Sequence, residues 1–148
     1  MRLAPFRALR YDPDVAGPGV ETSAPPYDEL DRLRYAAHRT ANPYTVLELI
    51  AGEGLASFEQ ARATLDRWHR TGVLVEDPSP AMYLYEEHEL RHGVPTVQRG
   101  IVAALDLEDL VDGALLLHEH VQEERAVLRA QRMQEVPIDL TPVVALHV

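Results

Sequence analysis

The sequence predicts an α+β fold with a mixed, largely antiparallel sheet, one hairpin and about three helices. Amphipathic helical stretches are mixed with strand-like runs, without the regular strand–helix alternation of a doubly wound parallel sheet. A strand–glycine–strand pattern in the second half indicates a hairpin. The 148 residues, 46% of them apolar, fit one domain spanning residues 1–148.

Turn-forming residues mark the boundaries of the first expected elements. Residues 2–11 have partly alternating apolar positions and predict an edge strand, followed by a loop over residues 12–19. Two prolines then hold the backbone extended, and Asp28 is placed to cap a helix that ends near Thr40. The apolar positions expected along that helix are Leu30, Leu33, Tyr35 and Ala37.

After a turn at Asn42-Pro43-Tyr44, residues 45–50 are the clearest buried strand of the first half. Ser57 then caps a helix that Gly72 terminates. Its apolar stripe consists of Phe58, Ala61, Leu65 and Trp68.

In the second half, residues 81–107 predict an antiparallel hairpin with its turn around Arg91-His92-Gly93. Residues 123–135 form a strongly helical run. The last stretch, residues 141–148, is strand-like, so we expect an open edge there or a homodimer formed through it.

Composition excludes several functions. All 14 basic residues are arginine, which removes every mechanism that needs a lysine amine, including a Walker-type phosphate loop and a Schiff base. The absence of cysteine removes thiol chemistry, and a formal charge of −10 disfavours nucleic acid. No signal-peptide or membrane-spanning pattern occurs, so no membrane partner is expected and the cytoplasm is the expected compartment.

One motif matches a zinc-protease pattern but fails on geometry. His88-Glu89-Leu90-Arg91-His92 fits the H-E-x-x-H expression, which requires both imidazoles on one face of a helix. Here the motif follows a strand and precedes Gly93. On a strand the two histidines would lie about 13 Å apart, too far for one zinc ion. We therefore expect an exposed hairpin end and no metal site.

A second cluster, His118-Glu119-His120, stands before the last helix. On a strand the two histidines would share a face; in a turn, all three side chains could approach the helix N-terminus, where backbone amides favour anions. The alternative is ordinary polarity at a helix start. Along the helix, Arg125, Arg129 and Arg132 form a basic stripe, which is either a solvated face paired with glutamates or a clamp for phosphate.

Ordered motifs along nearly the whole chain resemble a bacterial and archaeal family known as domain of unknown function 1015. They are, in order, APFRALRY at 4–11, APPYD at 24–28, NPY at 42–44, YLY at 83–85, RGIVAA at 99–104, HEHV at 118–121, Arg129 and LTPV at 140–143. The resemblance implies that the chain is the N-terminal portion of a longer protein. It also implies a distant likeness to ParB and sulfiredoxin-type nucleotide-binding folds, some of whose relatives phosphorylate free serine.

The resemblance assigns roles to specific residues. It implies Glu119 as general base and His118 and Arg129 as groups that stabilise phosphate, with ATP or ADP and Mg²⁺ as cofactors. Tyr27 and Asp28 match the family's Pro-Pro-Tyr-Asp segment and would face this site. The acid of the family's Asp-Arg pair is missing, because Leu128 stands in its place.

Three functions are therefore considered for a chain with these residues. The first is an ATP-dependent phosphotransferase acting on a small-molecule substrate such as serine, and the second is a non-catalytic nucleotide- or metabolite-binding or assembly domain. A metalloprotease survives only if residues 88–92 are helical. The missing acid counts against catalysis.

Overall fold

The computed structural model describes residues 2–25, 30–50, 56–106 and 122–140, and the chain divides into two compact units. The hairpin unit comprises Met1–Arg10 and Glu76–His120. The helical unit comprises Tyr11–Val75 and Val121–Val148.

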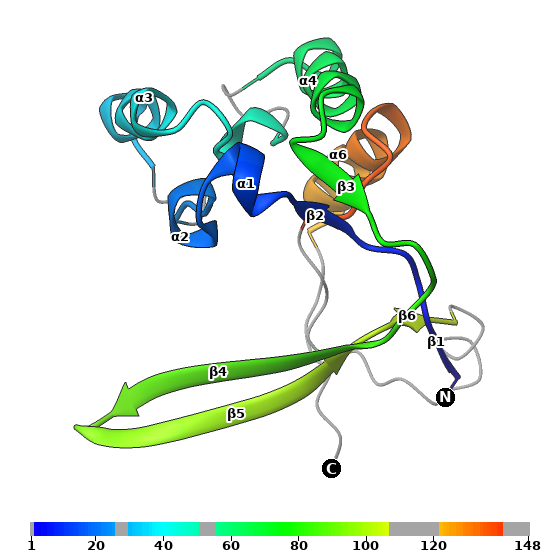
Figure 1. Ribbon diagram of the computed structural model, residues 1–148. Helices are drawn as coiled ribbons and strands as arrows, with labels where there is room; N and C mark the ends of the chain where they lie inside the picture. The colour runs from blue at the N-terminus through cyan, green and yellow to red at the C-terminus, as the bar shows by residue number, and fades with distance from the viewer. Residues whose placement is uncertain (1, 26–29, 51–55, 107–121, 141–148) are drawn as a thin grey trace. The chain divides into compact units, whose positions relative to one another are not determined.

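The hairpin unit is built on a long antiparallel ribbon of β4 (Tyr83–Arg91) and β5 (Val94–Val102), shown in Figure 1. The strands pair without a bulge from Tyr83 opposite Val102 to Arg91 opposite Val94. His92 and Gly93 form the connection, and both have positive φ, at 51° and 79°. This is the geometry of the two-residue turns that match the twist of paired strands, and it confirms the predicted hairpin.

The ends of the same unit are joined by short pairings between distant segments. β1 (Leu3–Ala4) pairs antiparallel with β6 (Ala104–Leu105), so the residues after Val102 leave the ribbon. Phe6 forms an isolated antiparallel bridge with Ala81. The predicted edge strand at residues 2–11 is therefore two short strands, β1 and β2 (Leu9–Tyr11), and β2 pairs with β3 (Leu74–Glu76).

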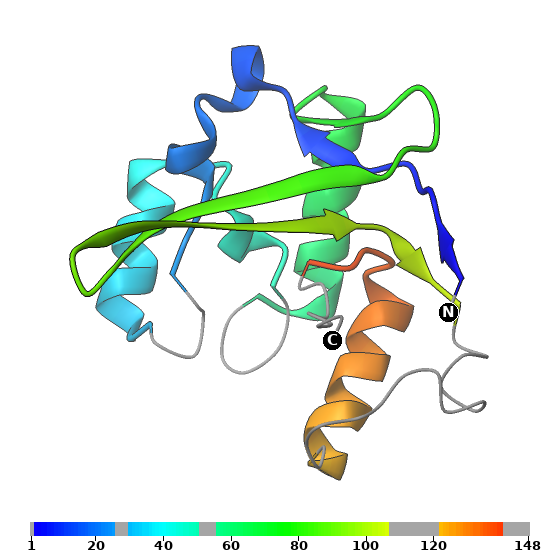
Figure 2. The same ribbon diagram turned by 90° about the horizontal axis from the view of Figure 1, so that it is seen from below.

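The helical unit contains short helices and three long ones within its described residues. The short helices are α1 (Pro13–Ala16), α2 (Gly19–Thr22) and the 3₁₀ turn η2 (Val46–Glu48), and the long ones are α3 (Arg32–Ala41), α4 (Phe58–Arg70) and α6 (Glu123–Glu135). A full capping box starts α4, in which Ser57 and Gln60 bond each other's backbone amides at 3.1 and 2.9 Å. Figures 1 and 2 show α6 beside α4, and the two helices are in contact.

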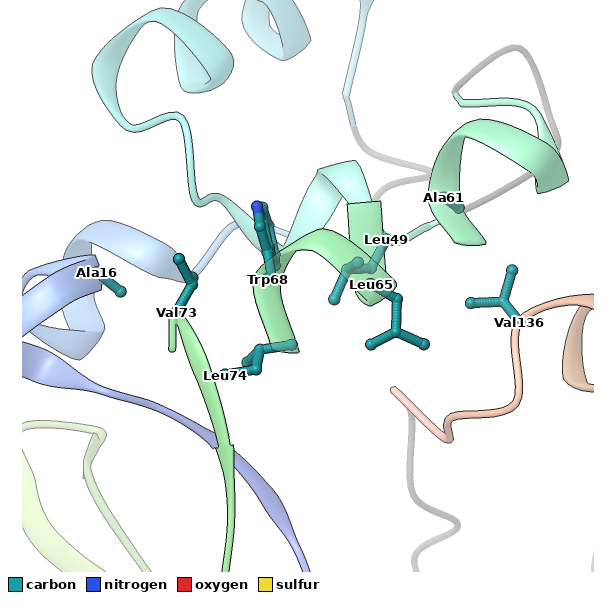
Figure 3. Packing of buried hydrophobic residues seen from close by; sticks show 8 residues of the cluster. All are labelled: Ala16, Leu49, Ala61, Leu65, Trp68, Val73, Leu74 and Val136. Atoms are coloured by element: carbon teal, nitrogen blue, oxygen red, sulfur yellow. The ribbon is translucent and has the colours of Figure 1, made fainter. Parts of the chain in front are cut away.

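The core of the helical unit surrounds Trp68 of α4, which is almost wholly buried. Tyr11 and Tyr44 pack on its indole with ring centroids 5.9 and 6.0 Å away, in the tilted and edge arrangements that aromatic pairs prefer. Figure 3 shows the rest of the cluster, contributed by α1, α4, β3 with the residue before it, and the segments after η2 and α6: Ala16, Leu49, Ala61, Leu65, Val73, Leu74 and Val136.

Two sequence predictions are wrong in this unit. Residues 45–50 form the 3₁₀ turn η2 and its flanks instead of a strand, although Leu47, Leu49 and Ile50 are buried as expected. A short apolar run does not distinguish a buried strand from a buried helical turn, and here the amide of Glu48 bonds the carbonyl of Thr45. The cap of α3 is Asp31 instead of the predicted Asp28: the carboxylate of Asp31 accepts a hydrogen bond from the amide of Arg34 at 2.8 Å.

The α+β class is confirmed, with the strands arranged as separate two-stranded pairs. The helices predicted after Ser57 and over residues 123–135 are confirmed, the second with the predicted bounds. The strand predicted at 141–148 lies outside the described residues. None of the helices in the described part of the chain has the length and apolar character needed to cross a bilayer.

Candidate functional site

The helix α6 presents arginines from successive turns on one face. Its composition, rich in Ala, Arg, Gln and Glu, favours helix at nearly every position, and Glu123 and Glu124 in the first turn complement the helix dipole. Arg129, Arg132 and Met133 follow the i, i+3, i+4 spacing of one helical face. All three line a single pocket.

The pocket lies between α6, the segment that follows it and the end of the η2 turn. Its apolar walls come from Leu49, Ile50, Met133, Val136, Ile138 and Leu140. Its charged lining is two guanidinium groups, Arg129 and Arg132, and one carboxylate, Asp139. Arg129 is exposed and Arg132 half-buried, so the site is open to solvent on one side and its charged lining sums to +1.

The cavity volume, about 20 Å³, is room for roughly one water molecule. A pocket that encloses a whole small-molecule ligand usually measures about 300–1,000 Å³. Only a single atom, such as one oxygen of a phosphate, could enter the cavity itself, with the rest of the group at its mouth. The fork of donors on each guanidinium suits phosphate or carboxylate, and the apolar walls would strengthen such a contact by lowering the local dielectric.

Mg²⁺ has less support than phosphate. Within the described ranges, no group of three or more His, Asp or Glu side chains could hold a metal ion, and Asp139 is the single carboxylate in the pocket lining. The described residues therefore fit the phosphate part of a nucleotide and supply no cage for a divalent cation.

A second polar cluster lies in the hairpin unit and centres on Asp77, which is 7% exposed. The Tyr83 hydroxyl donates to its Oδ2 at 2.5 Å, and Arg10 donates from Nε to its Oδ1 at 2.7 Å. Arg7 donates from Nε to the backbone carbonyl of Asp77 at 2.7 Å and pairs with Glu76. The amide of Ala8 completes the cluster by donating to the Tyr83 hydroxyl at 3.1 Å.

Three groups of this cluster, Asp77, Tyr83 and Arg10, shift one another's pKa. The hydrogen bond from Tyr83 and then that from Arg10 hold the pKa of Asp77 below its usual range. The same bond raises the pKa of Tyr83, and the carboxylate raises the pKa of Arg10. Both carboxylate oxygens of Asp77 accept hydrogen bonds within the protein. The cluster therefore has a structural role, because it binds the N-terminal segment to residues 76–83.

The structure describes only one of the residues predicted to form the site. Arg129 lines the α6 pocket, whereas Tyr27, Asp28, His118 and Glu119 lie outside the described residues. Their convergence with Arg129 stays a prediction. Leu128, in the place of the family's acid, is half-buried.

Sequence reasoning missed Asp139 and the contribution of Leu49 and Ile50 to the pocket. Nothing local marks these residues, because the pocket joins positions about eighty apart in the chain. Arg132 had a signal in the basic stripe of α6, and its spacing from Arg129 was the clue to a shared face.

The zinc-protease pattern is excluded by the structure. His88 lies on β4, where its Nε2 is 2.6 Å from Glu86 Oε1, and His92 lies in the turn. Neither histidine lies on a helix, and this strand-and-turn arrangement is the one that the sequence predicted.

Fold and pocket together define an α+β protein with an arginine-lined surface site. The family model described as protein of unknown function (DUF1015) matches residues 3–148, and the chain belongs to this family. Neither a curated protein nor a solved structure matches the chain, and the likeness to ParB and sulfiredoxin-type folds has no support.

Proposed function

We propose that this chain binds a phosphate-bearing small molecule, a nucleotide being the expected form, through the α6 pocket. The observation that carries the proposal is the placement of Arg129 and Arg132 on one helical face over an apolar floor. In a protein without lysine, guanidinium pairs are the side-chain groups best suited to holding a phosphate.

The negative charge of the protein favours the α6 pocket over the rest of the surface as the place for an anionic ligand. The chain carries a formal charge of −10, so most of its surface repels anions, and an anionic ligand needs a local basic site. The pocket lining, with its net +1, provides one. The same overall charge disfavours nucleic acid as a partner, and the cytoplasm is the proposed compartment.

The small cavity limits the binding mode. A terminal phosphate would contact Arg129 and Arg132, while the rest of the ligand would lie over the surface of α6. Asp139 would disfavour additional negative charge next to it, so a ligand presenting one phosphate at the pocket fits better than one presenting several.

Phosphoryl transfer to a small hydroxyl acceptor is the second candidate. It is favoured by the finding that Arg129, the residue matched to the family's arginine, lines the pocket. Glu119 would then act as the base on the acceptor hydroxyl, and His118 with Arg129 would stabilise the transferred phosphate. Leu128 in place of the acid makes binding without transfer the first candidate.

A thermal-shift series tests binding. The chain would be scanned with ATP, ADP, pyrophosphate and inorganic phosphate, each with and without Mg²⁺. A ligand present at 100 times its Kd should stabilise the fold by about 2.7 kcal/mol. The proposal predicts that the shift is lost in Arg129→Ala. An equal shift in that variant would place the ligand elsewhere.

A turnover assay separates the two candidates. If the chain is a phosphotransferase, Glu119→Gln should keep the ligand-induced thermal shift and abolish phosphate transfer to serine. If it only binds, the wild-type chain should show the shift and no transfer.

A further inference from the structure

The β4–β5 ribbon has one mainly polar face, on which Val94 is also exposed, and one face with apolar residues at both ends. On the polar face, hydrogen bonds and ion pairs link neighbouring side chains: Tyr85 with Glu87 at 2.8 Å, Gln98 with Glu89 at 3.0 Å, and Arg91 with Glu89. These residues alternate along the strands with those of the opposite face, as the register of the ladder requires.

On the other face, apolar pairs occupy both ends. Leu84 lies opposite Ile101 near the base, and Leu90 lies opposite Pro95 near the turn. Leu84, Leu90 and Ile101 are 75%, 73% and 64% exposed. We call this surface the apolar face, and it also includes Val97.

A compact ion cluster occupies the middle of the apolar face. Glu86 accepts from Arg99 Nε at 2.6 Å with one carboxylate oxygen, and its other oxygen is 2.6 Å from His88 Nε2. Glu86 and Arg99 neutralise each other within one copy of the chain. The cluster can therefore be covered without burying an unpaired charge.

Among the described residues, the apolar face of the ribbon is left largely exposed, which favours a partner for it. Isolated hairpins are marginally stable at best in water, and a contiguous exposed apolar patch usually marks an interaction surface. In the described part of the chain, β4 and β5 pair only with each other. The pairing and the exposure together make the apolar face a candidate interaction surface.

We propose that a second copy of this chain covers it, the two ribbons packing face to face about a two-fold axis along their length. Each β4 then lies over the β5 of the other copy. This places Leu84 over Ile101 and Glu86 over Arg99 of the other copy, and His88 over Val97. The outer apolar pair therefore meets an apolar pair, and the Glu86 and Arg99 charges each meet their opposite. A surface that complements itself in this way is what a two-fold dimer requires.

The size of the face sets the expected affinity. Nine-residue strands span about 30 Å, and two of them are about 10 Å wide, so each copy contributes a face of about 300 Å², which is below the size of stable interfaces and in the range of weak, transient association. We therefore expect a reversible dimer with a Kd on the order of 10 µM.

Charge reversal tests the arrangement in solution by sedimentation velocity on the 148-residue chain. The wild type should dimerise with rising concentration. Glu86→Arg and Arg99→Glu, each alone, place like charges face to face and should be monomeric. An equimolar mixture of the two variants should recover dimers, because the positive face of one then meets the negative face of the other.

Two further variants keep the test decisive if a reversed charge perturbs the ribbon itself. Leu84→Ser leaves every backbone hydrogen bond of the ladder in place and should weaken the dimer at least tenfold, whereas Glu87→Arg on the polar face should leave it unchanged. A wild type that stays monomeric tenfold above the expected Kd would overturn the proposal. So would a dimer that survives Leu84→Ser, or two charge variants that fail to recover dimers when mixed although amide exchange shows their ribbons folded.

Discussion

At the scale of single residues, the N-terminal motif has a structural explanation. Arg7 and Arg10, two of the residues that carry the family resemblance, bind Asp77 and its neighbour Glu76. Arginines in such a motif can indicate a phosphate site. Here their guanidinium groups instead bind the carboxylates of Asp77 and Glu76 and the backbone carbonyl of Asp77. The candidate ligand site instead uses arginines of α6.

The first prediction concerns Asp77→Asn. Because Tyr83 and Arg10 lower the pKa of Asp77 in the folded state, the carboxylate stabilises the fold fully above the ordinary aspartate pKa, about 3.9. That stabilisation is lost as pH falls through the lower, folded-state pKa. Urea midpoints should therefore show the variant less stable at pH 7, with a difference that shrinks below about pH 4.

Asp66→Asn is the matched control for this prediction. Asp66 forms an exposed ion pair with Arg62 one helical turn away, a type worth only about 0.3–0.5 kcal/mol. A stability difference for Asp77→Asn that does not change with pH would mean that its charge is not what the cluster binds.

At the scale of elements, local chemistry decided which parts of the fold could be predicted. The cap at Ser57 and the helix-favouring run from Glu123 predicted α4 and α6, and the turn around His92-Gly93 predicted the ribbon. Residues 45–50 could not be predicted as a 3₁₀ turn, because Thr45, Leu47 and Leu49 are buried in alternation with half-buried residues, and so short an alternating run also fits a strand.

The second prediction is that Gly93→Ala weakens the ribbon by about 1–2 kcal/mol. Gly93 has a φ of 79°, in the left-handed region where a Cβ is strained, although no heavy atom lies within 4 Å of the added carbon. Faster hydrogen exchange of the β4 and β5 amides would report the loss. Gly19→Ala, at a helical position with equal space and ordinary φ, should cause no loss.

At the scale of the whole molecule, the contacts that matter join distant parts of the sequence. β1 pairs with β6 across about one hundred residues, and the α6 pocket joins Leu49 and Ile50 to the end of α6. Local patterns do not encode such pairings, so the class of the fold and its hairpin could be predicted, but not its long-range pairings or the walls of the pocket. Only Arg129 and the basic stripe pointed to the site in advance.

The third prediction tests the core assembled from these distant segments. Trp68→Ala removes the indole between Tyr11 and Tyr44 and should lower the free energy of unfolding by about 3–5 kcal/mol. Leu33→Ala is the control, because Leu33 is 83% exposed on α3 and its loss should change stability by less than about 0.5 kcal/mol. Equal effects in a urea titration would contradict the described core.

The most direct test of the central claim is the affinity of the chain for its phosphate-bearing ligand, measured by calorimetric titration in two arginine variants. Arg129 and Arg125 stand one turn apart on α6, and only Arg129 lines the pocket. Losing a charge-assisted hydrogen bond of about 1.5–3 kcal/mol should raise the Kd of Arg129→Ala by roughly ten- to a hundredfold. Arg125→Ala should stay within about twofold of wild type, because an exposed charge outside the pocket contributes little. Equal losses in the two variants would show that only the general basicity of α6 attracts the ligand, and the proposed site would then be wrong.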